Sequence, residues 1–503
     1  MHFNRRKTAS FVGIGLIVLV MLSAATRCAI HLVSHNYNLA AEANGLYGIL
    51  DLADGRALYP PRTQKPYSVY LYPPFHAWLN AQVLTGLGIT ELRDRVLTVR
   101  ILSLMALLSA IAIFWSALKV PARQRFIYWF ALTLLLSKFA DYATTARNDM
   151  LSLWFEVSAL SAFLVWIDRQ QVRYLVYWFL ASYFAFFTRQ TGIAVFGAGV
   201  TWLAVRGEWK NAVRLGFLFS ALVAGLFIGL CAVTDGAFFE QVILANIRPF
   251  RPVDRDFFDF SLLSFIASYL LLLVFVTLGL RGIIARGDER DKFLALALGY
   301  TFSVASFLFL RAGGDVNYFF ISLFIGQYFC ARALANLGWH SFLVMPWRWG
   351  TAFALQSALI VFVCGYKSKS AYELAFLPYE KAADRVLHEI PPMGFLLGHY
   401  AQNMGIHLRG WAIHGPDVTN AGNIAENGHP QLRWLIKDLA NSINQRSVST
   451  IVLAEPRCQT KCGPLEEPIY RAYTEKECWY EWFCLYRPVR PTSHEVVLES
   501  SRK

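Results

Sequence analysis

Long apolar blocks alternate with short polar connections through the first two thirds of the chain. Each block runs for roughly 17 to 22 residues, which is long enough for a helix to cross a hydrocarbon core of about 30 Å. We predict about eleven transmembrane helices. The first reaches from Phe11 toward His31, and the others are expected over residues 100–118, 126–142, 150–167, 173–188, 191–206, 214–233, 261–280, 293–310, 318–335 and 350–366.

The N-terminus has the basic start and apolar middle of a signal peptide. Its apolar run is longer than a usual signal core, and further spans follow, so we interpret it as an uncleaved first span. Cleavage after Ala24-Ala25 is the alternative.

The segment from Phe75 to Leu87 is apolar but short, so it fits either a short span or an interfacial helix. If it does not cross, the short basic connections all lie on the side of Arg5-Arg6-Lys7, which the positive-inside rule makes cytoplasmic. We therefore predict that it does not cross. These connections hold Lys119, Arg123 and Arg125; Arg169 and Arg173; Arg206, Lys210 and Arg214; and Arg281, Arg286, Arg290 and Lys292.

The first outer loop, from His35 to Pro74, is too polar and too rich in Pro and Gly to continue the first span. Apolar residues at helical spacing, followed by Gly55, predict a short helix over Asn38–Ala53. Such an amphipathic helix would lie at the membrane interface with its acidic residues toward water or a cavity. The acidic residues are Glu42, Asp51 and Asp54. The alternative is a lid-like loop without chemistry.

Polar residues at the outer ends of the spans share the side of this loop. Ionisable groups at membrane depth are costly and usually line a functional cavity. Any single one could be snorkelling or paired structurally, but their convergence predicts a site. They are Arg147-Asn148-Asp149, Arg189-Gln190, Arg248, Arg311 and Asp315-Val316-Asn317-Tyr318.

The apolar runs stop near Lys367. Expected strands and helices, such as a helix over Gln431–Asn441 and a buried strand over Thr450–Ala454, predict a soluble α/β domain. The odd number of spans places it outside.

The eight cysteines form two groups. Cys28, Cys231, Cys330 and Cys364 lie in or beside apolar runs. The other four crowd into a short polar stretch whose spacing matches no common zinc module well, so two disulfides in an oxidising compartment fit better and no metal site is expected. Their pairing stays open. These four are Cys458, Cys462, Cys478 and Cys484.

Composition supports a membrane protein, because 56% of the 503 residues are hydrophobic and only 16% are charged, against about a quarter in soluble domains. The net charge of +13 is interpreted as loop charge that sets topology and meets anionic lipid. Nucleic-acid binding is not expected. The chain has no Gly-rich phosphate loop, HExxH or GxSxG, so nucleotide, zinc or serine hydrolase chemistry has no motif support.

Several short motifs, in order, resemble the C-type (GT-C) membrane glycosyltransferases, the group of protein O-mannosyltransferases and lipid A aminoarabinose transferases. They are the loop segment AEANGLYGILDLADG, with Glu42 thirteen residues before Gly55, then YPP, ARND, FTRQTG and GGDVNYF. The resemblance covers about residues 10–335. It implies an all-α polytopic membrane protein with a membrane domain over 1–366, a large first outer loop over 32–99, and an extracytoplasmic α/β domain over 367–503.

The resemblance also implies a reaction. A sugar carried on polyprenyl phosphate would pass to a lipid, glycan or protein acceptor on the outer face of the plasma (inner) membrane, with inversion and with no required cofactor. A divalent cation is compatible but not indicated. A carboxylate base would deprotonate the acceptor, and cations would stabilise the lipid phosphate. The implied catalytic residues are Glu42 and Asp149, and the implied substrate-binding residues are Arg147, Arg189, Gln190, Arg311, Asp315, Asn317, Tyr318, Tyr72, Pro73 and Lys65.

The chain departs from the family pattern in two places. Relatives carry Asp-Glu where this chain has Ala41-Glu42, so Glu42, Asp51 or Asp54 would take over as base, or the usual reaction has been lost. The Lys of KPP is Tyr72 here, and Lys65 is either its substitute or a solvated loop residue.

Two other classes of protein remain. A transporter or flippase usually shows internal repeats, and we find none. A non-catalytic scaffold would explain the missing Asp but not the matching Arg and carboxylate positions.

Overall fold

The computed structural model describes residues 18, 21–32, 40–61, 70–118, 139, 142–246, 263–311, 316–336, 394–397, 440–441, 443–445, 450–453, 472–479 and 483–488. The chain forms two compact units, one made of Met1–Ser34, Tyr72–Gly229 and Pro249–Ala375, the other of His35–Leu71, Leu230–Arg248 and Phe376–Lys503. The expected span 350–366, the expected domain boundary at 366/367 and most of the helix expected over Gln431–Asn441 lie outside the described residues.

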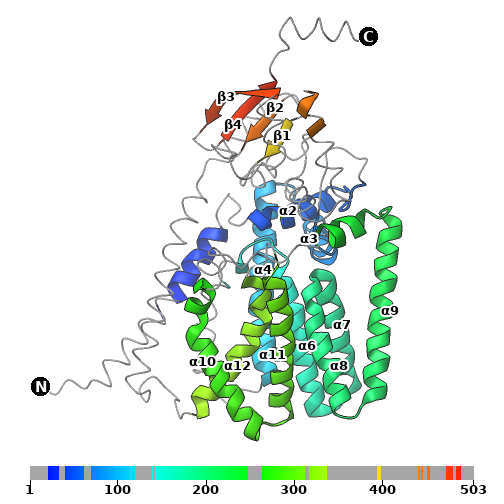
Figure 1. Ribbon diagram of the computed structural model, residues 1–503, viewed down its shortest axis with the longest axis vertical. Coiled ribbons are helices and arrows are strands. Elements are labelled where there is room, and N and C mark those ends of the chain that lie inside the picture. The colour runs from blue at the N-terminus through cyan, green and yellow to red at the C-terminus, as the bar shows by residue number, and fades with distance from the viewer. Residues whose placement is uncertain are drawn as a thin grey trace, which may run out of the picture. The chain divides into compact units, whose positions relative to one another are not determined.

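The first unit is a bundle of helices joined by short connections. Helix α6 packs against α4 and α7, α8 packs against α11, and α10 packs against α12 (Figure 1). Its helices are α3 (Phe75–Gly86), α4 (Leu92–Leu118), α6 (Asp149–Arg169), α7 (Val172–Thr188), α8 (Ile193–Val205), most of α9 (Trp209–Val233), α10 (Leu263–Arg286), α11 (Glu289–Phe309) and α12 (Phe320–Asn336), with the 3₁₀ turns η2 (Gln190–Gly192) and η6 (Val316–Phe319).

Five of the described helices are long and apolar enough to cross a membrane: Leu92–Leu118, Asp149–Arg169, Trp209–Val233, Glu289–Phe309 and Asn317–Asn336. They differ sharply in burial. Only 6% of the most apolar stretch of Trp209–Val233 is buried, against 83% for Asn317–Asn336. An apolar helix that is exposed along its length requires an apolar solvent, and lipid supplies it. The chain is therefore a helical membrane protein.

Helix α3 is short. Its 12 residues extend for about 18 Å, which is less than the roughly 30 Å of a hydrocarbon core. This length favours the interpretation that the segment after Pro73-Pro74 does not cross.

Small residues allow several helices to approach closely. A Cβ atom at Gly279 of α10 would collide with the backbone carbonyl of Phe329 in α12. A Cβ at Gly199 of α8 would collide with the indole of Trp178 in α7. Close backbone approach at small residues is a main way in which membrane helices associate.

In the second unit, the first outer loop forms helix α2 (Ala40–Ala53), close to the predicted range. Gly55 follows with φ +74°, and the Arg56 N–H donates to the Asp51 carbonyl at 2.8 Å. This is the left-handed cap with which many helices end. Of the two surroundings expected for the acidic residues of this helix, water and a cavity, burial excludes bulk water for Glu42, which has no exposed surface. Burial of Leu46 and Ile49 on the same helix shows that α2 packs inside the protein.

A second segment of this unit holds the loop backbone in place. The Gln241 side chain accepts from the Tyr70 N–H at 2.9 Å and donates to the Pro60 carbonyl at 3.1 Å. The Asn246 amide donates to the Leu71 carbonyl at 2.6 Å. Gln241 and Asn246 lie in a π-helical stretch η3 (Phe239–Ile243) and a 3₁₀ turn η4 (Leu244–Asn246). The loop after α2 is thus fixed by side chains nearly 180 residues away.

A four-stranded sheet has the order β1-β2-β4-β3 (Figure 1). Its strands are β1 (Gly394–Leu397), β2 (Thr450–Leu453), β3 (Tyr473–Trp479) and β4 (Phe483–Pro488). The β1–β2 pair is parallel and the other two pairs are antiparallel. The strand expected over Thr450–Ala454 is confirmed as β2.

Candidate active site

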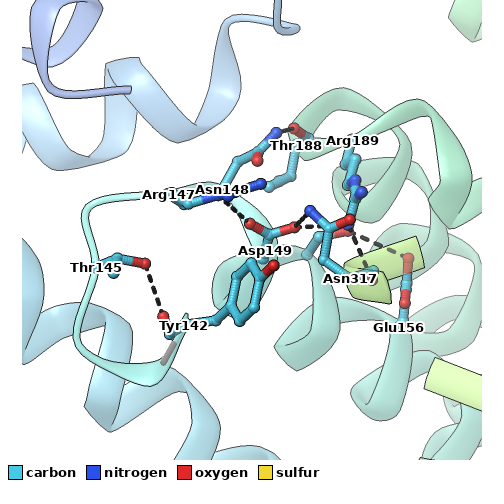
Figure 2. Close-up of polar contacts among 10 residues, drawn as sticks. Tyr142, Thr145, Arg147, Asn148, Asp149, Glu156, Thr188, Arg189 and Asn317 are labelled. Atoms are coloured by element: carbon cyan, nitrogen blue, oxygen red, sulfur yellow. Dashed lines mark hydrogen bonds and ion pairs between the residues drawn. The ribbon is translucent and has the colours of Figure 1, made fainter. Parts of the chain in front are cut away.

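A buried carboxylate, Asp149, lies at the first residue of α6, where it contacts three predicted site residues. Arg147 Nε lies 2.7 Å from Oδ2, and Arg189 Nη1 lies 2.7 Å from Oδ1. The Asn317 amide donates to Oδ1 at 2.8 Å (Figure 2). The three partners come from the turn before α6, the end of α7 and the turn η6. The structure therefore brings together Arg147 and Asn317, which are 170 positions apart in the chain, as the sequence predicted for the polar residues at the outer ends of the spans.

Local structure fixes the two arginines. The Asn148 side chain donates to the Thr188 carbonyl at 3.1 Å, which ties the start of α6 to the end of α7 (Figure 2). Arg189 follows directly in extended backbone conformation, and it also donates to the Asn317 carbonyl at 3.3 Å. The guanidinium carbon of Arg189 lies 4.4 Å from the centre of the Tyr318 ring. These contacts hold Arg189 in one place before any ligand arrives.

Arg147 is supported in a similar way. Its guanidinium carbon lies 4.9 Å from the centre of the Tyr142 ring. The Thr145 hydroxyl closes the turn by donating to the Tyr142 carbonyl at 2.9 Å (Figure 2). A guanidinium over an aromatic face gains cation–π attraction, which is stronger away from water.

A second buried carboxylate, Glu156, lies seven residues after Asp149 on the same helix and is 5% exposed. The Ser152 hydroxyl donates to its Oε1 at 3.2 Å. Its charge interacts with that of Arg189. Two arginines and two carboxylates thus share one buried region, where desolvated charges usually mark function rather than stability.

His76 is a further buried group near this cluster. It is the second residue of α3, and it lies close enough to Asp149 for this carboxylate to favour the protonated imidazole. Burial lowers the pKa of His76 to about 4, against a smaller opposing effect of Asp149. The imidazole is therefore neutral at physiological pH. Its neighbour Phe75 packs against Phe155 of α6 and Phe184 of α7, with ring centres 5.6 Å and 4.8 Å apart.

The three loop carboxylates have different surroundings. Arg56 pairs with Asp51 at 3.0 Å and with Asp54 at 3.2 Å. These two carboxylates therefore neutralise a nearby arginine at the end of α2. Glu42 lies in the first turn of α2, at the opposite end of the helix, and is fully buried.

The remaining predicted residues are placed as follows. Gln190 begins η2, and Pro73 is buried just before α3, next to a half-buried Tyr72. The Arg311 guanidinium carbon lies 4.6 Å from the centre of the Phe307 ring. Lys65, Arg248, Asp315, Cys458 and Cys462 lie outside the described residues.

Within the described part of the chain, no group of three His, Cys, Asp or Glu side chains could hold a metal ion. That the reaction requires no cofactor, and that a divalent cation is compatible but not indicated, both stay predictions.

The sequence reasoning missed Glu156 and His76. For Glu156 a signal existed, because a carboxylate in an apolar span, two helical turns from Asp149, shares its face. For His76 the only sequence signal was its place two residues after Pro73-Pro74.

No model of a known protein family matches the chain, and no curated protein matches it in sequence. Solved structures do match. ArnT from Cupriavidus metallidurans in the apo state aligns over 95% of this chain and 98% of its own, with a TM-score of 0.61 and 13% identity. The same enzyme bound to undecaprenyl phosphate gives a TM-score of 0.58 with the same identity and coverage.

An oligosaccharyltransferase from Archaeoglobus fulgidus, tethered to an acceptor peptide containing an NVT sequon, aligns over 94% of this chain and 74% of its own. Its TM-score is 0.51 at 12% identity. Likeness at such low identity concerns the fold, and it extends over nearly the whole chain. The protein has the fold of the GT-C membrane glycosyltransferases.

Proposed function

We propose that the protein is a membrane glycosyltransferase that moves a sugar from a polyprenyl-phosphate donor to an acceptor on the outer face of the membrane. The observation that carries this proposal is the buried Asp149 held between Arg147 and Arg189 at 2.7 Å each. Support for the donor class comes from ArnT, which has this fold and was solved bound to undecaprenyl phosphate.

The two arginines fit the leaving group. As the bond between the anomeric carbon and the phosphate oxygen breaks, the electron pair goes to the phosphate, whose charge must be stabilised. Guanidinium groups do this well, because their planar forks match phosphate oxygens. Arg189 is already fixed by Asp149 and Tyr318, so little reorganisation is needed when charge develops.

The new bond forms between the acceptor hydroxyl oxygen and the anomeric carbon, and the hydroxyl proton needs a base. We assign this role to Glu42, because its spacing to Gly55 matches the pattern of the family that the sequence resembles. A single displacement of this kind inverts the anomeric configuration and requires no covalent intermediate. Asp149, in contrast, holds two arginines and is assigned to their orientation.

A panel assay tests the proposal. Purified protein in proteoliposomes would be offered undecaprenyl phosphate linked to glucose, mannose, galactose or arabinose, together with cell-envelope lipids, glycans and peptides. We expect at least one donor to be cleaved, with undecaprenyl phosphate released and the sugar attached to an acceptor. No cleavage of any donor, with the donor instead moved across the bilayer intact, would favour a flippase.

A further inference from the structure

Two polar atoms near Asp149 have no hydrogen-bond partner among the described residues. One is Oδ1 of Asn317, whose amide nitrogen already donates to Asp149. The other is Nδ1 of His76. Asn317 is 5% exposed and His76 is 3% exposed, so bulk water does not satisfy them.

Orphan atoms of this kind need a reason. A buried donor or acceptor left unpaired costs about 1–3 kcal/mol, and native proteins carry few of them. These two lie close to the carboxylate that orients the arginines, so they are available to hydrogen-bond a molecule bound there.

The chemistry of the two atoms restricts that molecule. The Asn317 carbonyl oxygen only accepts hydrogen bonds, so it repels a phosphate oxygen and fits a donor such as a hydroxyl. His76 is neutral at physiological pH because burial lowers its pKa to about 4, and a neutral imidazole donates or accepts a single bond at each nitrogen. Both atoms suit a neutral, hydroxyl-bearing group.

Position connects this group to the donor. Arg189, the proposed phosphate ligand, donates both to Asp149 and to the Asn317 carbonyl of the main chain. A hydroxyl at the Asn317 side chain is therefore close to the phosphate, where the sugar is attached. Phe75 packs against α6 and α7, and so fixes the start of α3 that carries His76 against the same two helices.

We propose that Asn317 Oδ1 and the His76 imidazole bind hydroxyl groups of the transferred sugar, forming a sugar subsite beside the arginines that hold its phosphate. This inference rests on the proposed function and adds to it the residues that distinguish sugar-loaded from empty carrier lipid.

The test uses His76→Phe, which keeps an aromatic ring and removes both nitrogens, with Gln82→Ala, an exposed change on the same helix, as the matched control. Undecaprenyl phosphate without sugar and the sugar-linked donor found active in the panel serve as probes. We expect His76→Phe to leave thermal stability unchanged or raised, because an orphan polar atom is removed. Affinity for undecaprenyl phosphate should change by less than about twofold, while kcat/KM for the sugar donor falls about 5- to 100-fold. His76→Asn, which keeps a polar atom near the ring position of Nδ1, should restore part of that loss.

Each other outcome has a distinct meaning. If the wild-type protein cleaves no donor, the proposed function fails and this inference fails with it. If the wild type is active and His76→Phe matches Gln82→Ala in kcat/KM, the sugar subsite is wrong while the function stands. If His76→Phe weakens the binding of undecaprenyl phosphate and of the sugar donor equally, His76 has a phosphate-binding role and the inference is overturned. A marked loss of thermal stability in His76→Phe would assign His76 a structural role and would also overturn it.

Discussion

Asp149 and Arg189 form an ion pair of 2.7 Å although 40 residues separate them in the chain, and their side chains are 1% and 11% exposed. Desolvation of two charges offsets much of their attraction, so a buried pair contributes little net stability. Removing one partner is costly, however, because the other charge stays buried. In this protein one carboxylate, Asp149, contacts both arginines directly, and an incoming phosphate would bring further negative charge to them.

Asp149→Asn should therefore destabilise the unliganded protein by about 3–5 kcal/mol. An anion that replaces the lost carboxylate charge should offset this. We expect undecaprenyl phosphate to raise the Tm of Asp149→Asn more than that of the wild type, measured by thermal unfolding in detergent, while turnover falls.

The matched control for this experiment is Asp168→Asn. Asp168 lies at the other end of α6 and pairs with Arg290 at 3.3 Å. Undecaprenyl phosphate should not raise the Tm of this variant beyond its effect on the wild type. Equal effects on both variants would contradict a phosphate site at the arginines beside Asp149.

Gly279→Ala should destabilise the helix bundle. The new methyl group would meet the backbone carbonyl of Phe329, and a backbone cannot move aside as a side chain can. Overpacking of this kind costs about 1–3 kcal/mol. Gly282→Ala on the same helix is the control, since its nearest neighbour would lie at an ordinary 3.5 Å. Thermal unfolding measures both, and similar Tm values for the two variants would refute the close contact between α10 and α12.

The register of β3 and β4 places Cys478 directly opposite Cys484. Opposed residues of an antiparallel pair have Cα atoms about 4.5–5.5 Å apart, which is within the range that a disulfide spans. Of the three pairings open to the four C-terminal cysteines, we therefore predict Cys478–Cys484 and Cys458–Cys462. Peptide mapping by mass spectrometry without reduction checks this. Free thiols at all four positions, or a stoichiometric zinc ion, would exclude it.

The sequence predicted the parts of the fold that follow from local pattern. Apolar spacing and Gly55 placed helix α2 within two residues of its observed start, because both the periodicity and the left-handed cap are local properties. The prediction that Arg147, Asp149, Arg189 and Asn317 share one face is also confirmed, since topology alone sets which span ends lie together.

Tertiary packing decided what the sequence left open. The buried state of Glu42 depends on what covers α2, including Tyr70 and Leu58 against Gly48. The contacts of Gln241 and Asn246 join segments nearly 180 residues apart, for which one sequence carries no signal. His76 enters the site because Phe75 packs on α6 and α7, and that too is invisible in the sequence.

Glu42→Gln tests the assignment of the base. The substitution keeps size and much hydrogen bonding but removes the proton acceptor, so turnover should fall about 10²–10⁴-fold with little change in donor binding. Asp51→Asn and Asp54→Asn should alter turnover far less, because these residues pair with Arg56. Steady-state kinetics with the active donor distinguishes the three. Full activity in Glu42→Gln, with loss in either aspartate variant, would move the base along the loop.

The central claim is that this protein breaks the bond between a sugar and a polyprenyl phosphate at the arginines beside Asp149. The most direct measurement follows both products of one donor, with the sugar labelled, in proteoliposomes of the wild type and of Arg189→Ala. The account predicts that the wild-type protein releases one undecaprenyl phosphate for each sugar attached to an acceptor. Arg189→Ala should bind undecaprenyl phosphate more weakly and also turn over more slowly, because a cation that faces the phosphate acts in both the ground state and the transition state. Labelled sugar that stays on its lipid in the wild type, or equal turnover and equal lipid binding in Arg189→Ala, would contradict it.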